Sequence, residues 1–330
     1  MLVSLHQAQR AFEMLPAALQ LPTLSPVYCA ADAIRTAGLA SRHLLFQSDA
    51  GFLLHSIHEE AVPEGGADWQ SPYGYGGPIG MGLDEPAQAR AWESFDRVAR
   101  EHKVIAEFVR FHPLANNERF YPGTVCDDRR TVAVDLEAVD LIESYTARGR
   151  NTLRKAQRCG LDCTWEDPPR FGQEFADFYR AGMNRIGARD FYLFEDAYFM
   201  ALLAIPYAQM LSVRRGAQLL AAGLFLFGPS VVEYHLSATE PEGRALGATN
   251  LLLHEAARRA QTEGRAQLYL GGGTDSRHDN ALLRFKESFA PAGPLFRIGY
   301  RILDAQRYEE LRQRYPEQAG LRRVLFYRSL

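Results

Sequence analysis

Residues 242–249 read EGRALGAT, and the fold predicted for the chain depends most on this stretch. Three apolar runs precede it, and a segment with helical apolar spacing and one more apolar run follow it. Short apolar runs of this kind are typical of strands, and the longer periodic segment is typical of a helix. Strands are predicted over 208–214, 218–227, 230–237 and 266–270, and a helix over 249–263. The sequence therefore predicts a sheet in which a helix begins directly after EGRALGAT.

This order of strands, loop, helix and strand resembles that of the GNAT acyltransferases. In members that use acyl-CoA, the loop carries a Q/R-x-x-G-x-G/A motif, and its backbone N–H groups bind the pyrophosphate at a helix N-terminus. Arg244 and Gly247 fit this motif, whereas Thr249 stands where its last glycine or alanine belongs. The resemblance implies that Arg244 and Gly247 bind donor phosphates. The alternative is an ordinary loop in which Thr249 caps the helix.

The N-terminal half shows a similar order of elements. Apolar runs at 43–47 and 52–56 predict a hairpin. Asp84 is placed to cap a helix that has Pro86 in its first turn. Further strands are predicted over 104–111 and 131–136. Between the halves, residues 140–157 predict a long basic helix.

The repeated order predicts two domains, over residues 1–137 and 138–330. Each domain is expected to contain a mixed sheet with helices on both faces, which is an α/β architecture of tandem GNAT-like domains. A last helix is predicted to start near Asp304, and it is a candidate to pack back on the first domain.

A second resemblance covers roughly residues 40–305. Six segments are similar to the Fem family: SPYGYGG (71–77), RFHP (110–113), GRNTLRKA (149–156), YHLSA (234–238), LGGG (270–273) and LRFKESF (283–289). Fem proteins are aminoacyl-tRNA-dependent peptidyltransferases with two GNAT-like domains. The resemblance implies an acyltransferase that forms an amide bond between an aminoacyl group from aminoacyl-tRNA and an amine. No tightly bound cofactor is expected. The rival interpretations are an acyl-CoA-dependent N-acyltransferase and a non-catalytic GNAT-like scaffold.

The Phe285–Lys286 pair is the candidate catalytic centre that the Fem resemblance implies. A lysine ammonium can stabilise the oxyanion that forms when an amine attacks an ester, and a phenylalanine ring can stack on the terminal adenine. The alternative is a core helix with Lys286 in solvent. His235, on a predicted strand, is the preferred candidate base among four histidines, the others being His112, His254 and His278.

Candidate substrate-binding residues come from the same motifs. They are Tyr73, Tyr75, Gly76, Gly77, Arg110, Tyr198, Tyr234 and Gly272. Glycines let a ligand approach the backbone, and tyrosines offer a flat face and a hydroxyl. For the 71–77 segment, a bent strand end with core tyrosines is the alternative.

One position departs from the cell-wall Fem ligases. These carry an arginine in an R-x-x-x-Y pattern that helps to bind the UDP-linked precursor. Here Tyr198 fits the tyrosine, but Phe194 takes the place of the arginine. The departure favours a small peptide, an amino acid or a natural-product intermediate as the acceptor.

The basic helix carries Arg150, Arg154 and Arg158 at i, i+4, i+8 spacing, which places them on one face. Such a stripe suits the phosphates of tRNA, although a solvated charged face is the alternative.

Composition narrows the function classes. The net charge of −3 argues against a general nucleic-acid coat but leaves room for a local basic patch. No apolar run reaches the ~20 residues that span a bilayer, and a signal-peptide core is lacking, so we expect a cytoplasmic protein. The four cysteines show no metal-ligand spacing and are predicted to be free buried thiols. No metal site is expected.

Overall fold

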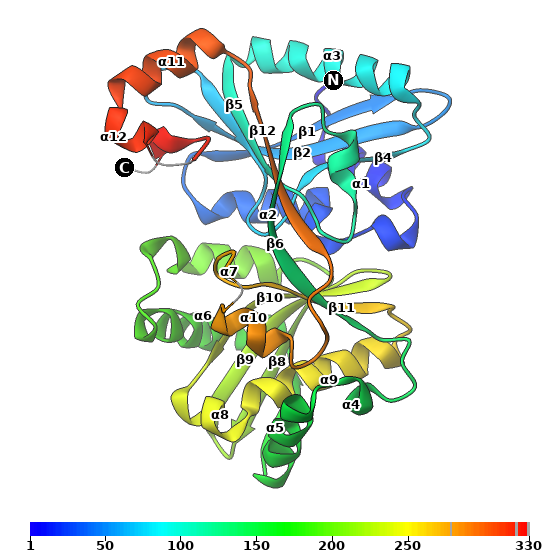
Figure 1. Ribbon diagram of the computed structural model, residues 1–330, viewed down its shortest axis with the longest axis vertical. Coiled ribbons are helices and arrows are strands. Elements are labelled where there is room, and N and C mark those ends of the chain that lie inside the picture. Colours follow the sequence, from blue (N-terminus) through cyan, green and yellow to red (C-terminus); the bar gives the residue numbers. More distant parts are fainter. Residues whose placement is uncertain (278, 321–322, 329–330) are drawn as a thin grey trace. The chain divides into compact units, whose positions relative to one another are not determined.

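The computed structural model describes residues 1–277, 279–320 and 323–328, and the chain divides into two compact units. Unit 1 consists of Met1–Asp128 and Phe296–Leu330, and unit 2 of Arg129–Leu295. The division differs from the predicted one at residue 137, because the C-terminal segment returns to unit 1. There β12 (Leu295–Ile302) pairs antiparallel with β5 (Val104–Arg110), a long-range contact that local sequence patterns do not encode (Figure 1).

Unit 1 is built on a mixed sheet with the strand order β1-β2-β3-β5-β12-β6, and β4 pairs separately with β2. The hairpin of β1 and β2 confirms the predicted one, and β3 runs parallel to β5. The remaining strand bounds are β1 Leu39–Gln47, β2 Phe52–Ala61, β3 Ala67–Gln70, β4 Gly77–Met81 and β6 Thr124–Asp135. The strand β6 begins in unit 1 and ends in unit 2.

The helices of unit 1 are α1 (Leu5–Glu13), α2 (Pro26–Asp32), α3 (Glu85–Glu101), α11 (Ala305–Arg314) and α12 (Pro316–Ala319). As predicted, Asp84 caps α3 by accepting the Ala87 N–H at 2.9 Å, and Pro86 lies in the first turn. The apolar face of α3 places Trp92 and Phe95 in the core. The 3₁₀ turns of unit 1 are Ala17–Leu19, Pro22–Leu24, Ala33–Arg35, Asn117–Phe120 and Phe326–Arg328.

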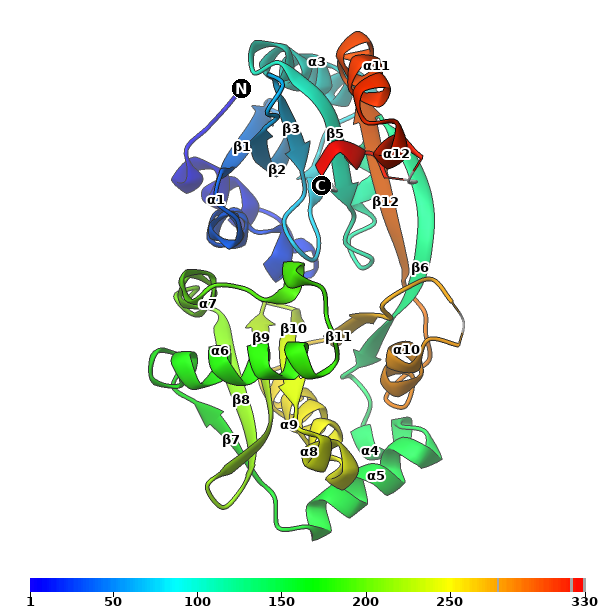
Figure 2. The same ribbon diagram turned by 90° about the vertical axis from the view of Figure 1, so that its left-hand side faces the viewer.

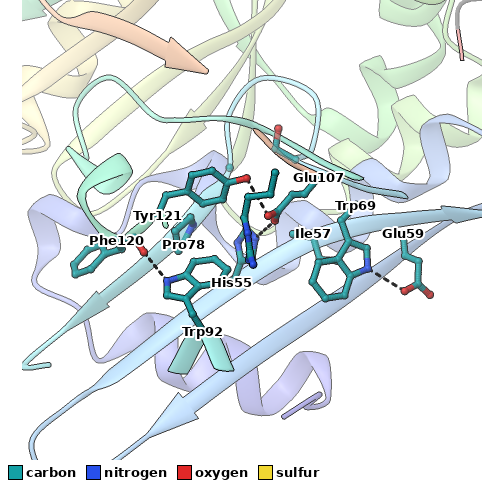
Figure 3. A network of polar contacts seen from close by, with 12 residues as sticks. His55, Ile57, Glu59, Trp69, Pro78, Trp92, Glu107, Phe120 and Tyr121 are labelled. Atoms are coloured by element: carbon teal, nitrogen blue, oxygen red, sulfur yellow. Dashed lines mark hydrogen bonds and ion pairs between the residues drawn. The ribbon is translucent and has the colours of Figure 1, made fainter. Parts of the chain in front are cut away.

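A buried polar network ties these elements together (Figure 3). The carboxylate of Glu107 on β5 lies 2.5 Å from Nε2 of His55 on β2, and it accepts the Tyr121 hydroxyl at 3.0 Å. Burial alone would raise the pKa of Glu107, but His55 and the two hydrogen bonds hold it below its usual value. Trp92 donates to the Phe120 carbonyl at 2.7 Å. Each of these side chains has at least one partner, although Nδ1 of His55 has none among the described residues, and the network serves to fix the core.

Unit 2 has the strand order β6-β11-β10-β9-β8-β7. The strands β10 and β11 are parallel and the other pairs are antiparallel. Their bounds are β7 Asp162–Glu166, β8 Ala208–Arg215, β9 Gln218–Phe227, β10 Val231–Thr239 and β11 Gln267–Gly272. The strands predicted around EGRALGAT are therefore confirmed to within a few residues.

Helices cover both faces of this sheet (Figure 2). Gly182 of α6 lies against Ala238 of β10, whereas Leu252 of α9 lies against Gly223, which pairs with Ser237. Because neighbouring strand residues point to opposite faces, α6 and α9 lie on opposite sides. The helix bounds are α4 Leu141–Ser144, α5 Ala147–Arg158, α6 Pro168–Arg185, α7 Asp196–Leu203, α8 Pro241–Leu246, α9 Ala248–Thr262 and α10 Ala281–Lys286, and a 3₁₀ turn spans Asp190–Tyr192.

The predicted basic helix over 140–157 is interrupted. Tyr145 is extended, and Thr146 caps α5 by accepting the Gly149 N–H at 3.2 Å. The Tyr145 side chain is buried against Phe289, with a ring separation of 5.1 Å, so core packing overrides the local helical pattern.

The four cysteines are free thiols, but only Cys29 is buried, and Cys126 is exposed. No helix within the described residues is long and apolar enough to cross a membrane.

Candidate functional site

Unit 2 contains a cavity of about 910 Å³ around the start of α9. Four cationic side chains and one carboxylate line it: Arg148, Lys155, Arg244, Arg284 and Asp279. Apolar side chains also line it, namely Met183, Ile186, Leu282 and Phe285, as do the polar side chains of Tyr234, Ser237, Thr239, Thr249 and Asn250. The cavity can therefore take a ligand that has both an anionic and an apolar part.

The N-terminus of α9 lies at the cavity. Gly247 ends α8 and starts α9. Gly247 has a φ of +82°, and a Cβ atom there would lie 2.9 Å from Thr152 of α5, so both conformation and space require glycine. No side chain caps the first turn of α9. A helix N-terminus has unpaired N–H groups and a partial positive charge, which suit an anion. Arg244 and Gly247 both line this cavity, and their role in binding donor phosphates stays a prediction.

The alternative role for Thr249, as the helix cap, is wrong. Thr249 lies inside the first turn of α9, and its hydroxyl lies 2.8 Å from that of Thr239 on β10. The EGRALGAT stretch is also mostly helical, since α8 extends through Leu246.

The strand β10 contributes Tyr234 to the cavity. Its ring stacks on Phe225 with 5.3 Å between centroids, its hydroxyl donates to Ser237, and burial raises its pKa to about 12. A register shift between Tyr234 and Leu236 makes His235 the extra residue of a bulge. His235 is half-buried and does not belong to the lining of the cavity.

The helix α10 separates the two members of the candidate catalytic pair. Phe285 lines the cavity, but Lys286 is buried at 7% exposure, and its Nζ donates to the Gly272 carbonyl at 2.8 Å. Burial lowers the pKa of the Lys286 ammonium to about 7. Lys286 is therefore not a solvated surface charge, and its contact is with the end of β11 rather than with the cavity lining. Gly272 is half-buried, and its carbonyl is occupied by this bond.

The cations of α5 lie on two faces. Arg148 and Lys155 line the cavity, and Lys155 donates to the Ala245 carbonyl at 2.8 Å. Arg154 and Arg158 are exposed, whereas Arg150 donates to the carbonyls of Tyr145 at 2.6 Å and Glu143 at 3.3 Å. The predicted stripe is thus reduced to two available arginines.

Sequence reasoning assigned no site role to Arg284 or Asn250. It counted Arg148 and Lys155 in the basic cluster of the helix, but it singled out Arg150, Arg154 and Arg158 as the phosphate-binding stripe. A signal existed for Arg148 and Lys155, since Arg148, Thr152 and Lys155 are spaced i, i+4, i+7 and share one helix face. For Arg284 and Asn250 no such signal stood in the sequence.

The glycine-rich segment predicted to bind substrate lies in unit 1. The Tyr73 backbone N–H donates to Asp32 at 2.7 Å, and its carbonyl accepts the Tyr28 hydroxyl. Gly76 donates to the Arg110 carbonyl at 2.7 Å, and its own carbonyl accepts the Asn117 amide at 2.9 Å.

Side chains in the same segment also have neighbours. The Tyr75 ring lies 4.8 Å from that of His112, and the Arg110 guanidinium lies 4.8 Å from the Phe108 ring. A Cβ atom on Gly77 would come within 3.0 Å of Asn117, Phe111 and Val109. Tight packing accounts for these glycines, and Tyr73, Tyr75 and Arg110 keep a substrate role only as a prediction.

Tyr198 and Phe194 belong to the core of unit 2. Tyr198 has no exposed surface, Phe194 is 3% exposed, and their rings lie 4.7 Å apart. An acceptor could not reach the buried Tyr198 side chain without local rearrangement. His278 lies outside the described residues.

No group of three metal-ligating side chains occurs in the part of the chain that the structure describes.

Comparison with known proteins agrees with this geometry. Residues 144–287 match the family profile of the acetyltransferase (GNAT) domain. No curated protein sequence matches the chain. Among solved structures, FemX is similar at 14% identity, with a TM-score of 0.71, over 94% of this chain and 99% of that one.

Two further structures share the fold. L-PGS from Bacillus licheniformis is 14% identical with a TM-score of 0.59, covering 90% of this chain and 91% of that one. A tandem GNAT protein from the clavulanic acid biosynthesis pathway is 11% identical with a TM-score of 0.52, covering 91% and 93%. Residues 144–287 thus form an acyltransferase domain of the GNAT type, and the whole chain shares its fold with FemX and with the tandem GNAT protein.

Proposed function

We propose that this acyltransferase forms an amide bond by moving an aminoacyl group from aminoacyl-tRNA to the amine of a peptide, an amino acid or a related precursor. The observation that carries the proposal is that α5 has positively charged side chains both in the cavity and on the exposed surface. Arg148 and Lys155 line the cavity, and Arg154 and Arg158 continue the charge onto the exposed surface of the same helix. A nucleic-acid donor that extends beyond the cavity has phosphates that can contact both the cations in the cavity and those on the exposed surface. The Fem-like motifs and the fold shared with FemX support the same choice.

Within the cavity, the chain's own groups have separable roles. The N-terminus of α9 and Arg244 are placed to bind phosphate near the activated end of the donor. Phe285 offers a ring face to a base. Aminolysis of the ester passes through a tetrahedral anion, which positively charged or N–H groups stabilise more than the ground-state carbonyl.

An acyl-CoA donor is the second candidate, and a specific observation favours it. Gly247, Arg244 and the uncapped first turn of α9 would suffice for a pyrophosphate without any contribution from the exposed face of α5.

Charge reversal on α5 separates the two donors. In Arg154→Glu/Arg158→Glu we expect weaker binding of aminoacyl-tRNA and a log–log salt slope that is smaller by about 2, since each lost phosphate contact removes about 1. Binding of CoA should not change. Arg244→Glu should weaken binding of whichever donor the protein uses.

The matched control is Arg90→Glu/Arg170→Glu, which changes net charge equally at exposed positions outside α5 and the cavity. Its tRNA binding should remain close to wild type. Saturable turnover of an acyl-CoA without measurable tRNA binding would establish the second candidate instead.

A further inference from the structure

Three asparagines are buried among the described residues, and two of them have complete sets of partners. Asn117 donates to the carbonyls of Gly76 and Pro78 and accepts the His112 N–H. Asn280 accepts two N–H groups of α10 and donates to Thr274 and Asp275. Asn250 is 7% exposed and lines the cavity, yet its carboxamide has no hydrogen-bond partner in the described part of the chain.

The side chains around Asn250 do not supply the missing partners. The hydroxyls of Thr239 and Thr249 are paired with each other at 2.8 Å, and the Tyr234 hydroxyl is paired with Ser237. A buried polar group without a partner destabilises the folded state, so most such groups in proteins are satisfied. Asn250 lies in the first turn of α9 and lines the cavity, and its carboxamide atoms are open to that cavity rather than enclosed in the core, so water can satisfy them until a ligand takes its place.

The chemistry of a carboxamide limits what can satisfy it. Asn250 offers an N–H donor and a carbonyl acceptor side by side, whereas a phosphate or carboxylate would accept only and leave the Asn250 oxygen unpaired. A secondary amide carries both complementary groups. Apolar side chains, among them Met183 and Ile186, also line the cavity and suit the rest of an extended chain.

We propose that Asn250 is a specificity-determining residue that binds an amide group of the substrate chain entering this cavity. The proposal rests on the proposed function in assigning the cavity to acyl transfer. The amide belongs either to the peptide of the acceptor or to the pantetheine arm of an acyl-CoA donor. Either source makes the reciprocal N–H···O=C pair with Asn250.

The first experiment separates a ligand-binding asparagine from a structural one. Asn250→Leu replaces the amide with an apolar group of similar shape, and we expect the thermal midpoint of the free protein to stay the same or to rise by about 2–4 °C. Asn280→Leu, the matched control, removes four hydrogen bonds and should lower the midpoint by several degrees. If Asn250→Leu is destabilised as strongly as Asn280→Leu, the side chain is structural and the proposal is wrong.

The second experiment uses calorimetry with defined probes and needs no turnover. The probes are coenzyme A, 3′,5′-ADP as its counterpart without pantetheine amides, and N-acetyl-alanyl-alanine amide. We expect Asn250→Leu to bind the peptide or coenzyme A about tenfold more weakly, equivalent to about 1.4 kcal/mol, with 3′,5′-ADP unaffected.

The pattern of losses identifies the source of the amide. A loss confined to the peptide indicates the acceptor, and a loss confined to coenzyme A indicates the pantetheine arm. Equal affinity of wild type and variant for both amide probes overturns the proposal, as does a wild type that binds neither. Failure of the proposed function would show separately, as a wild type that binds a probe but consumes no aminoacyl-tRNA.

Discussion

The glycine-rich segment at 71–77 was predicted to bind substrate and the EGRALGAT stretch to bind donor phosphates, but the polar groups of the segment and of the cavity at the start of α9 differ in whether they have partners. In the 71–77 segment, backbone groups bond to Asp32, Tyr28, Arg110 and Asn117, so the polar chemistry there is used within the fold. In the cavity, the first turn of α9 lacks a side-chain cap and Asn250 lacks a partner among the described residues.

The two regions differ in what surrounds their required glycines. Both regions have glycines that no other residue could replace, Gly77 in one and Gly247 in the other. At Gly77 the space is filled by Phe111 and Val109, which are core side chains. At Gly247 the bare backbone starts a helix whose end faces a cavity. A required glycine alone therefore does not mark a site, since it accompanies close packing in one region and a helix start at a cavity in the other.

The largest expected effect tests the structural role of Gly77. Gly77→Val places a branched side chain at a φ of +94°, where even a Cβ atom would lie within 3.0 Å of three neighbours. Strain and overpacking together should lower the free energy of unfolding by roughly 3–5 kcal/mol, measured by urea denaturation. Gly74→Ala is the control, since it has a φ of +91° but no neighbour closer than 3.7 Å, and should cost about 1 kcal/mol. Equal losses in both variants would show that packing does not distinguish them.

An intermediate effect concerns Lys286, whose buried ammonium has no carboxylate partner within the described residues. Its folded-state pKa of about 7 lies below the ordinary 10.5, so between these values the unfolded chain binds the proton more strongly. Stability should then rise with pH across this window, by at most about 1.4 kcal/mol per pH unit. We expect the difference in unfolding free energy between wild type and Lys286→Met to follow this rise, and a pH-independent difference would contradict the burial effect.

The same variant tests the catalytic role that the Fem resemblance implies. Loss of an oxyanion-stabilising group would lower single-turnover aminoacyl transfer by about 100-fold or more. The opposite outcome is transfer at a rate close to wild type while the pH-dependent difference in unfolding free energy between wild type and variant is observed. Lys286 would then belong to the structure of the β11–α10 junction alone.

The smallest expected effect returns to the 71–77 segment. Tyr28→Phe removes the hydroxyl that donates to the Tyr73 carbonyl and should cost about 1 kcal/mol of stability. Acyl transfer should remain unchanged, because the hydroxyl is used inside unit 1. A large loss of turnover at nearly unchanged stability would show that the 71–77 segment is part of a functional site.

Local patterns were sufficient for much of the fold. Apolar runs located the strands of unit 2, and Asp84 with Pro86 located the start of α3. The division of the chain into units was not predictable in this way, because the pairing of β12 with β5 joins residues almost 200 positions apart. Tyr145 interrupts the predicted basic helix for a similar reason, since its ring packs on Phe289 in the core.

The site was predictable to the extent that it depends on local backbone. Gly247 and Arg244 were recognised from the loop, and they do meet at the start of α9. The direction of the Lys286 side chain, the two carbonyls bound by Arg150 and the missing partners of Asn250 depend on distant segments. Local periodicity carries no information about them.

The return of the C-terminal segment to unit 1 has a consequence for synthesis on the ribosome. Unit 2 is one continuous stretch of chain, whereas the sheet of unit 1 lacks β12 until residues 296–302 have emerged. Until then β5, with the sequence VIAEFVR, has an open edge, which is the kind of surface that pairs with other chains. Domains usually fold in the order in which they are made, but here the first-made unit is completed last. In a nascent chain of this protein, the edge of β5 that β12 later covers therefore stays open throughout the synthesis of unit 2.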